Sequence, residues 1–144
     1  MKEISFYNEG TEIPSFFSED LTLRWFDKIA DDYEVELGEL SFIFCNDDYI
    51  LDVNQKYLEH DYYTDVITFD YSEDDVLSGD IFISVDTVRS NSELFKTDME
   101  EEFNRVLCHS LLHLIGFKDK MPEEEQEMRQ NEDKCLNLLK TIKK

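Results

Sequence analysis

Cysteine is scarce in this sequence, with three residues, Cys45, Cys108 and Cys135, among 144. Their number is odd and no two are spaced as Cys-x-x-Cys, which argues against a disulfide framework and against a cysteine-rich zinc cluster. Two of the three fall on segments with apolar faces. We therefore expect reduced thiols that are packed in the protein interior.

Long apolar runs are also missing. No segment approaches the roughly 20 apolar residues that a transmembrane helix needs. The first residues, Met1 to Phe6, alternate between polar and apolar side chains as a strand does and do not resemble a signal peptide. These observations predict a soluble, cytoplasmic protein without a membrane partner.

Basic residues are few: 14 lysines and arginines stand against 35 aspartates and glutamates, for a net charge of -21. Such a charge argues against indiscriminate binding to polyanions, and DNA is not expected as a partner. RNA is compatible with it, because a cleft that holds a metal ion can bind a phosphate while the remaining surface repels it. We expect weak binding to free RNA and recognition that depends on a protein partner or a preassembled ribonucleoprotein.

Apolar material is sufficient for a core despite the charge. Hydrophobic residues make up 41% of the chain and aromatic residues 13%, which argues against global disorder. A chain of this length is the size of one ordinary domain. We therefore expect a single domain over residues 1–144.

Apolar periodicity and turn residues predict four strands and about five helices. The strands are expected at residues 2–7, 40–45, 65–71 and 79–84, the last two as a long-looped hairpin. The helices are expected after residue 18, from 46–48 to 58, at 86–95, from 97–100 through the histidines, and from 122 onward. Gly38 is placed in a connection, and Thr97-x-x-Glu100 is interpreted as a capping box. The pattern predicts an α+β (mixed α/β) domain with a four-stranded sheet and a central metal-binding helix.

The most informative segment is HSLLHLIGFKD, which begins at His109. His109 and His113 are four residues apart, so on a helix both imidazoles lie on one face and can bind one ion. Gly116 can adopt the left-handed conformation that ends a helix, and the chain can then return Asp119 as a third ligand. Two imidazoles and a carboxylate suit zinc or a similar divalent metal and leave a fourth position for water, as in catalytic zinc sites. One zinc ion per chain is expected.

Other interpretations of this segment remain open. His60 is the third histidine of the chain and could replace Asp119 as a ligand, and the histidine pair could also lie half-buried without a metal. Arg105 shares the helix face of the histidines. Asp65 and Asp70 could assist catalysis, although aspartates near strand ends are more often turn or edge residues.

The same segment resembles the signature of the YbeY family, the metal-dependent endoribonucleases of bacterial ribosomal RNA maturation. The stretches NQKYLEHDYYTDVITF and SGDIFIS resemble the family's middle region, so the resemblance covers about residues 35–130. It implies a compact α/β fold whose histidine helix lines a cleft, with His109 and His113 as metal ligands. It also implies cleavage of single-stranded RNA in ribosomal RNA processing and ribosome quality control, with ribosomal RNA and ribosomal or assembly proteins as partners.

The sequence departs from the family pattern at two positions. Asp119 stands where the family usually has a third histidine, and a bound carboxylate should weaken the pull of the metal on its water and on a phosphate oxygen. Leu58 stands where an arginine is common, and Lys56 or Arg105 could supply the missing positive charge. A lysine would do so only as a point charge, without an arginine's bidentate grip.

Two other functions are compatible with the pattern. A metal-containing acidic protein could dock onto basic ribosomal or assembly proteins without catalysis, with the metal serving structure. A metallopeptidase ranks third, because the His-Glu-x-x-His motif places a general base where this chain has Ser110. An endoribonuclease is the interpretation that the residues favour.

Overall fold

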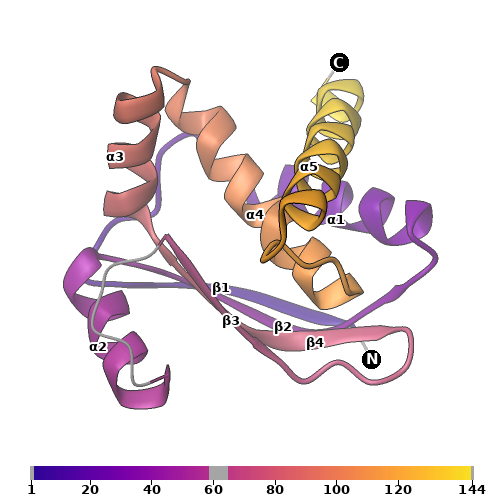
Figure 1. The fold of residues 1–144 in the computed structure, drawn as a ribbon, viewed down its shortest axis with the longest axis horizontal. Coiled ribbons are helices and arrows are strands. Elements are labelled where there is room, and N and C mark those ends of the chain that lie inside the picture. The colour runs from indigo at the N-terminus through magenta and orange to yellow at the C-terminus, as the bar shows by residue number, and fades with distance from the viewer. Residues whose placement is uncertain (1, 59–64, 144) are drawn as a thin grey trace.

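The computed structural model describes residues 2–58 and 65–143 of the chain (Figure 1). The strands are β1 (Glu3–Glu9), β2 (Glu36–Cys45), β3 (Val66–Asp70) and β4 (Val76–Ser84). The helices of the described residues are α1 (Glu19–Asp32), α2 (Asp47–Leu58), α3 (Val85–Phe95), α4 (Met99–Ile115) and α5 (Pro122–Lys143). The predicted α+β class, the four-stranded sheet and the helix count are confirmed.

The strands form one mixed sheet in the order β1-β2-β4-β3. The pairs β1–β2 and β2–β4 are parallel, and β3 returns antiparallel to β4 at the edge. The predicted hairpin of the third and fourth strands is therefore confirmed. Helices α1, α4 and α5 cover one face of the sheet, and α2 lies against the other face near one end (Figure 1).

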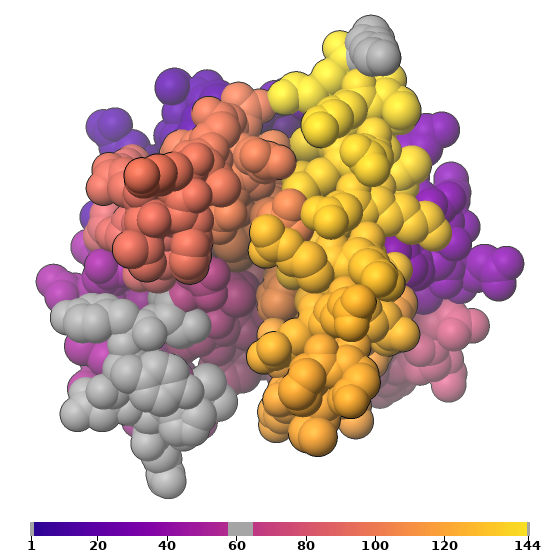
Figure 2. All heavy atoms as spheres, turned by 45° about the horizontal axis from the view of Figure 1, so that its top comes forward, coloured from indigo at the N-terminus to yellow at the C-terminus, as the bar shows by residue number. Residues whose placement is uncertain are grey.

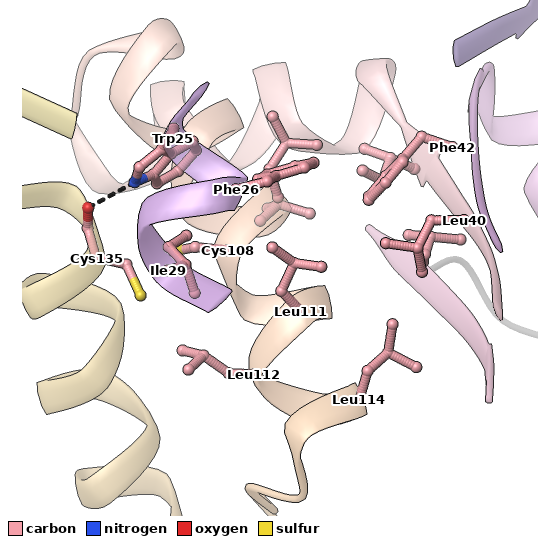
Figure 3. Packing of buried hydrophobic residues seen from close by; sticks show 14 of the residues in the cluster. Trp25, Phe26, Ile29, Leu40, Phe42, Cys108, Leu111, Leu112, Leu114 and Cys135 are labelled. Carbon is pink, nitrogen blue, oxygen red and sulfur yellow. Dashed lines mark hydrogen bonds between the residues drawn. The ribbon is translucent and has the colours of Figure 1, made fainter. Parts of the chain in front are cut away.

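Helix α4 packs centrally against the sheet, as predicted from its apolar stripe. Phe103, Leu107 and Leu111 of this helix are fully buried. Figure 3 shows Leu111 beside Phe26 of α1 and facing the β2 side chains. Each fully buried side chain of this size stabilises the fold by about 1.5–3 kcal/mol, so the core holds α4 in place.

Helix α5 is tied to α1 on the outer side of α4. The Trp25 indole N–H donates a hydrogen bond of 2.8 Å to the Cys135 carbonyl (Figure 3). Trp25 is fully buried, so this bond satisfies a donor that water cannot reach. The contact fixes the position of α5 relative to the core.

Two local predictions were wrong in detail. Gly38 lies inside β2 and not in a connection, at a register shift between Leu37 and Leu40 where a Cβ atom would lie 2.8 Å from the Leu77 carbonyl oxygen. Only glycine allows that close approach of two backbones. The cap of α4 is Asp98 and not Thr97, because the Asp98 carboxylate accepts the Glu101 N–H at 3.3 Å.

The predicted state of the thiols is confirmed, since Cys45, Cys108 and Cys135 are all free and buried. Among residues 2–58 and 65–143, no helix combines the length and the apolar character that crossing a bilayer demands.

Candidate metal centre

Helix α4 presents the two histidines one above the other, since they are four residues apart. Their ring centroids are 4.5 Å apart and the rings are nearly perpendicular, at 84°. The His109 side chain is 20% exposed and the His113 side chain is 30% exposed, so both are partly accessible to solvent. Gly116 ends the helix with a φ of 128°, as expected, and its N–H donates to the Leu112 and His113 carbonyls. The chain then returns over the helix end.

This return brings Asp119 to both histidines. Its Oδ2 atom lies 3.3 Å from His109 Nε2 and 3.4 Å from His113 Nε2. One ligand atom from each of the three residues lies within 4.8 Å of the others. Two ligand atoms bound about 2.0–2.1 Å from a tetrahedral zinc are separated by about 3.4 Å. The donor set therefore fits a zinc-sized divalent cation.

The outer nitrogen of each imidazole is held by an acceptor. His109 Nδ1 lies 2.5 Å from the Glu132 carboxylate, and His113 Nδ1 lies 3.1 Å from the Phe117 carbonyl oxygen. A carbonyl and an ionised carboxylate can only accept a hydrogen bond, so each Nδ1 donates its proton outward and each Nε2, the nitrogen left to bind a metal, faces Asp119. This arrangement is typical of metal-binding histidines, whose second nitrogen is fixed by a carboxylate or a carbonyl.

Glu132 is in turn held by Arg105. Glu132 is 6% exposed, and its Oε1 atom accepts a hydrogen bond of 3.0 Å from the Arg105 guanidinium. The same guanidinium donates to Asp133 at 2.9 Å. Arg105 therefore binds two carboxylates, and its positive charge compensates the buried charge of Glu132.

Glu132 was not among the predicted site residues. A signal for it was present, because Glu132 follows Met128 by four residues and so falls on the apolar stripe of α5 that leads to Cys135. A carboxylate on a buried helix face requires a partner. The sequence could not show that the partners were Arg105 and His109.

The groups around His109 shift the pKa of its imidazole. Burial lowers the pKa of the His109 imidazole, but the hydrogen bond and charge of Glu132, with the charge of Asp119, raise the pKa further, and the net shift is upward. The imidazole of the metal-free protein therefore keeps its second proton to a higher pH than usual. Metal binding must release that proton.

A hollow of about 310 Å³ lies beside the centre, between α3 and the first half of α5 (Figure 2). Its lining includes Asp65, Phe95, Arg105, His109 and Asp119. Burial raises the pKa of the Asp65 carboxyl, partly opposed by the charge of His109. The structure therefore brings Asp65 to the edge of the histidine site.

The remaining predicted residues lie elsewhere. Lys56 is 65% exposed on α2 and forms an ion pair of 3.1 Å with Asp52. Asp70 accepts the Ser72 N–H at 2.8 Å, which is the turn role that its position favoured. His60 and the side chain of Leu58 lie outside the described residues. The His60 alternative therefore stays a prediction.

Ser110 occupies the position of the general base of zinc peptidases and has a structural role. Its hydroxyl is fully buried and donates to the Leu107 carbonyl at 2.6 Å. A serine in this position supplies no carboxylate next to the first histidine. The geometry agrees with the argument against peptidase chemistry.

Comparison with known proteins places the geometry in context. A family model described as endoribonuclease YbeY matches residues 3–140. Endoribonuclease YbeY of Parabacteroides distasonis is 46% identical over 136 residues, which cover 94% of this chain and 95% of that protein. The protein of the same name from Phocaeicola vulgatus is 48% identical over 136 residues, which cover 94% and 98%. The solution structure of a Thermotoga maritima protein aligns with a TM-score of 0.65 at 26% identity, over 95% of this chain and 89% of that one.

Proposed function

This chain belongs to the YbeY family of endoribonucleases, and on that premise we propose that it cleaves single-stranded RNA with one zinc ion held by His109, His113 and Asp119. The observation that carries this proposal is the convergence of two Nε2 atoms and one Oδ2 atom at 3.3 and 3.4 Å, with both outer nitrogens fixed. The functional unit is a single domain over residues 1–144. Its cellular task is ribosomal RNA processing and ribosome quality control.

In the proposed site, the protein residues bind the metal ion and orient the two imidazoles that hold it. Glu132 and the Phe117 carbonyl hold the two imidazoles in the tautomer that presents Nε2, and Asp119 closes the third side. A divalent metal bound by these three groups leaves one position open and would polarise a phosphate oxygen and acidify a water molecule. The fixed imidazoles need no rearrangement before binding, which favours catalysis through preorganisation.

Asp65 is the best placed of the three candidate catalytic residues. It lines the same hollow as His109 and Asp119, whereas Lys56 lies on α2 and is paired with Asp52. The guanidinium of Arg105 is bound to carboxylates, so we assign it to holding Glu132 in position. Asp65 would accept or return a proton in the hollow.

The charge of the protein limits how RNA is recognised. A net charge of -21 repels free polyanions, so we propose that ribosomal RNA is presented together with ribosomal or assembly proteins. Three free buried thiols suit a reducing compartment, which supports a cytoplasmic location.

One experiment tests both the ligands and the reaction. Metal content and cleavage of single-stranded ribosomal RNA are measured for the wild type, His113→Ala and Asp119→Ala. Asp52→Ala serves as a control, because this aspartate is exposed on α2. The proposal expects about one zinc per chain in the wild type and the control, and loss of metal and cleavage together in both ligand variants.

The outcomes separate the alternatives. Unchanged metal content in Asp119→Ala would show that another group, such as His60 or water, completes the site. Bound metal without RNA cleavage in the wild type would favour the acidic accessory protein with a structural metal. Cleavage of peptides but not of RNA would favour a peptidase.

A further inference from the structure

We propose that Phe95 and Arg129 form a nucleotide-binding subsite across the hollow beside the metal centre, in which Phe95 stacks on a base and Arg129 binds a phosphate. Phe95 comes from the end of α3 and Arg129 from α5, and both line the hollow together with His109. Figure 2 shows α3 and α5 on its two sides. This inference rests on the proposed cleavage of RNA and adds which residues bind the RNA strand beside the metal centre.

Phe95 has the exposure of a binding residue. It is 64% exposed, although aromatic side chains in the described part of the chain are mostly packed in the core. Lys96 follows it in the left-handed conformation, with a φ of 55°, and its N–H donates to the Glu93 carbonyl. The helix end thus fixes the backbone that carries the ring. An exposed ring at a capped helix end offers a face on which any base can stack.

Arg129 is the arginine of the hollow that has no ion pair among the described residues. Arg105, the other arginine there, is bound to Glu132 and Asp133 and is only 13% exposed. Arg129 is exposed on α5. A guanidinium that is not bound to a carboxylate can bind two oxygens of a phosphate at once. Arg129 therefore offers the positive charge that neither Lys56 nor Arg105 has free.

The charges that line the hollow make Arg129 important for binding an RNA phosphate. Four carboxylates and two arginines line it, so the lining is negative by itself and a divalent cation cancels that excess. With the cation bound, Arg129 is the exposed arginine in the lining of the hollow, since Arg105 is bound to two carboxylates. An RNA strand can then place one phosphate at the metal centre and a neighbouring one at Arg129.

The test uses the metal-loaded full chain with two probes. A short single-stranded oligoribonucleotide reports KM and kcat, and the same sequence with 2′-O-methyl sugars reports the dissociation constant by fluorescence anisotropy. Bis(p-nitrophenyl) phosphate, which offers no nucleobase, reports the chemistry of the metal centre alone. The variants are Phe95→Ala, Phe95→Tyr and Arg129→Gln. Leu94→Ala and Arg24→Gln are the matched controls, since Leu94 is 72% exposed beside Phe95 and Arg24 lies on α1.

Phe95→Ala is expected to weaken binding and raise KM by roughly 5- to 150-fold, with kcat and phosphodiester hydrolysis unchanged. Phe95→Tyr should restore binding because it keeps the ring. Arg129→Gln should flatten the dependence of log affinity on log salt by about 0.7, the value for one phosphate contact with a single strand. Arg24→Gln should leave that slope unchanged.

The two proposals fail in different ways. If the wild type cleaves RNA but Phe95→Ala has the same KM and dissociation constant as Leu94→Ala, the base-stacking half of the subsite is overturned. If Arg129→Gln has the same salt dependence of affinity as Arg24→Gln, the phosphate-binding half is overturned. Either result leaves the proposed function intact. A metal-loaded wild type that hydrolyses bis(p-nitrophenyl) phosphate but not RNA would overturn the proposed function and the subsite together.

Discussion

Glu132 Oε2 lies 2.5 Å from His109 Nδ1, although the two residues are 23 positions apart and on different helices. The contact joins α5 to α4 at the metal centre. Because Arg105 binds the other carboxylate oxygen, the orientation of the His109 ring depends on a chain of three side chains, of which Glu132 is buried and Arg105 and His109 are partly buried.

Glu132→Gln should weaken zinc binding by about 10- to 100-fold while the protein stays folded. The amide is nearly the same size as the carboxylate but lacks its charge, so it holds the His109 proton less strongly. Zinc affinity would be measured by competition with a chelating dye, and folding by circular dichroism. Asp133→Asn removes the other acidic partner of Arg105 without touching His109, and it should keep the wild-type affinity. Equal affinities in all three proteins would contradict the assigned role of Glu132.

Asp119→His should retain about one zinc per chain and cleave RNA severalfold faster than the wild type. A neutral imidazole in place of the carboxylate raises the net charge of the bound site by one unit, and the metal then attracts a phosphate oxygen more strongly. Single-turnover rates at saturating RNA would isolate this effect from binding. A slower variant with full metal content would show that Asp119 has a further task in the hollow.

Chelation of the metal should abolish cleavage and leave the fold in place. The core of α1, α4 and the sheet is built from buried apolar side chains and does not include the metal ligands, so helix content should persist and the melting temperature should fall only modestly. Circular dichroism and thermal melts with and without EDTA measure this, and added zinc should restore activity. Cooperative unfolding on chelation would instead indicate a structural site.

Cys45→Ala should reduce the loss of stability at alkaline pH. Burial, with the nearby charges of Asp47, Asp86 and Glu9, raises the pKa of the Cys45 thiol to about 12 from an ordinary 9.0. Below the ordinary value both states hold the proton. As the pH rises from 9.0 towards about 12 the unfolded chain alone loses the proton, so the free energy of unfolding falls by up to about 1.4 kcal/mol per pH unit.

Urea titrations at several alkaline pH values would measure this slope in both proteins. The variant should show a shallower slope than the wild type and a small, constant loss of stability at neutral pH. Identical slopes would show that the Cys45 thiol ionises in the folded protein.

Several elements could be predicted from the sequence because their signals are local. The spacing of His109 and His113 fixes their relation on any helix, and Gly116 marks where that helix ends. The hairpin of β3 and β4 follows from two apolar runs joined by an acidic turn. Boundaries were less secure, as Gly38 and Asp98 show, since a close backbone approach and a one-residue change of cap depend on neighbours that are distant in sequence.

The sequence by itself indicated the helix that carries the histidines, the family and the residues proposed as ligands, with His60 left open as an alternative to Asp119. Only the tertiary structure decided that Glu132 holds His109, that Arg105 is occupied by carboxylates, and that Phe95 and Arg129 line one hollow. The physical reason is how far apart in the sequence the contacting residues lie. Helix geometry fixes contacts within four residues, whereas contacts between α3, α4 and α5 depend on how the whole core packs.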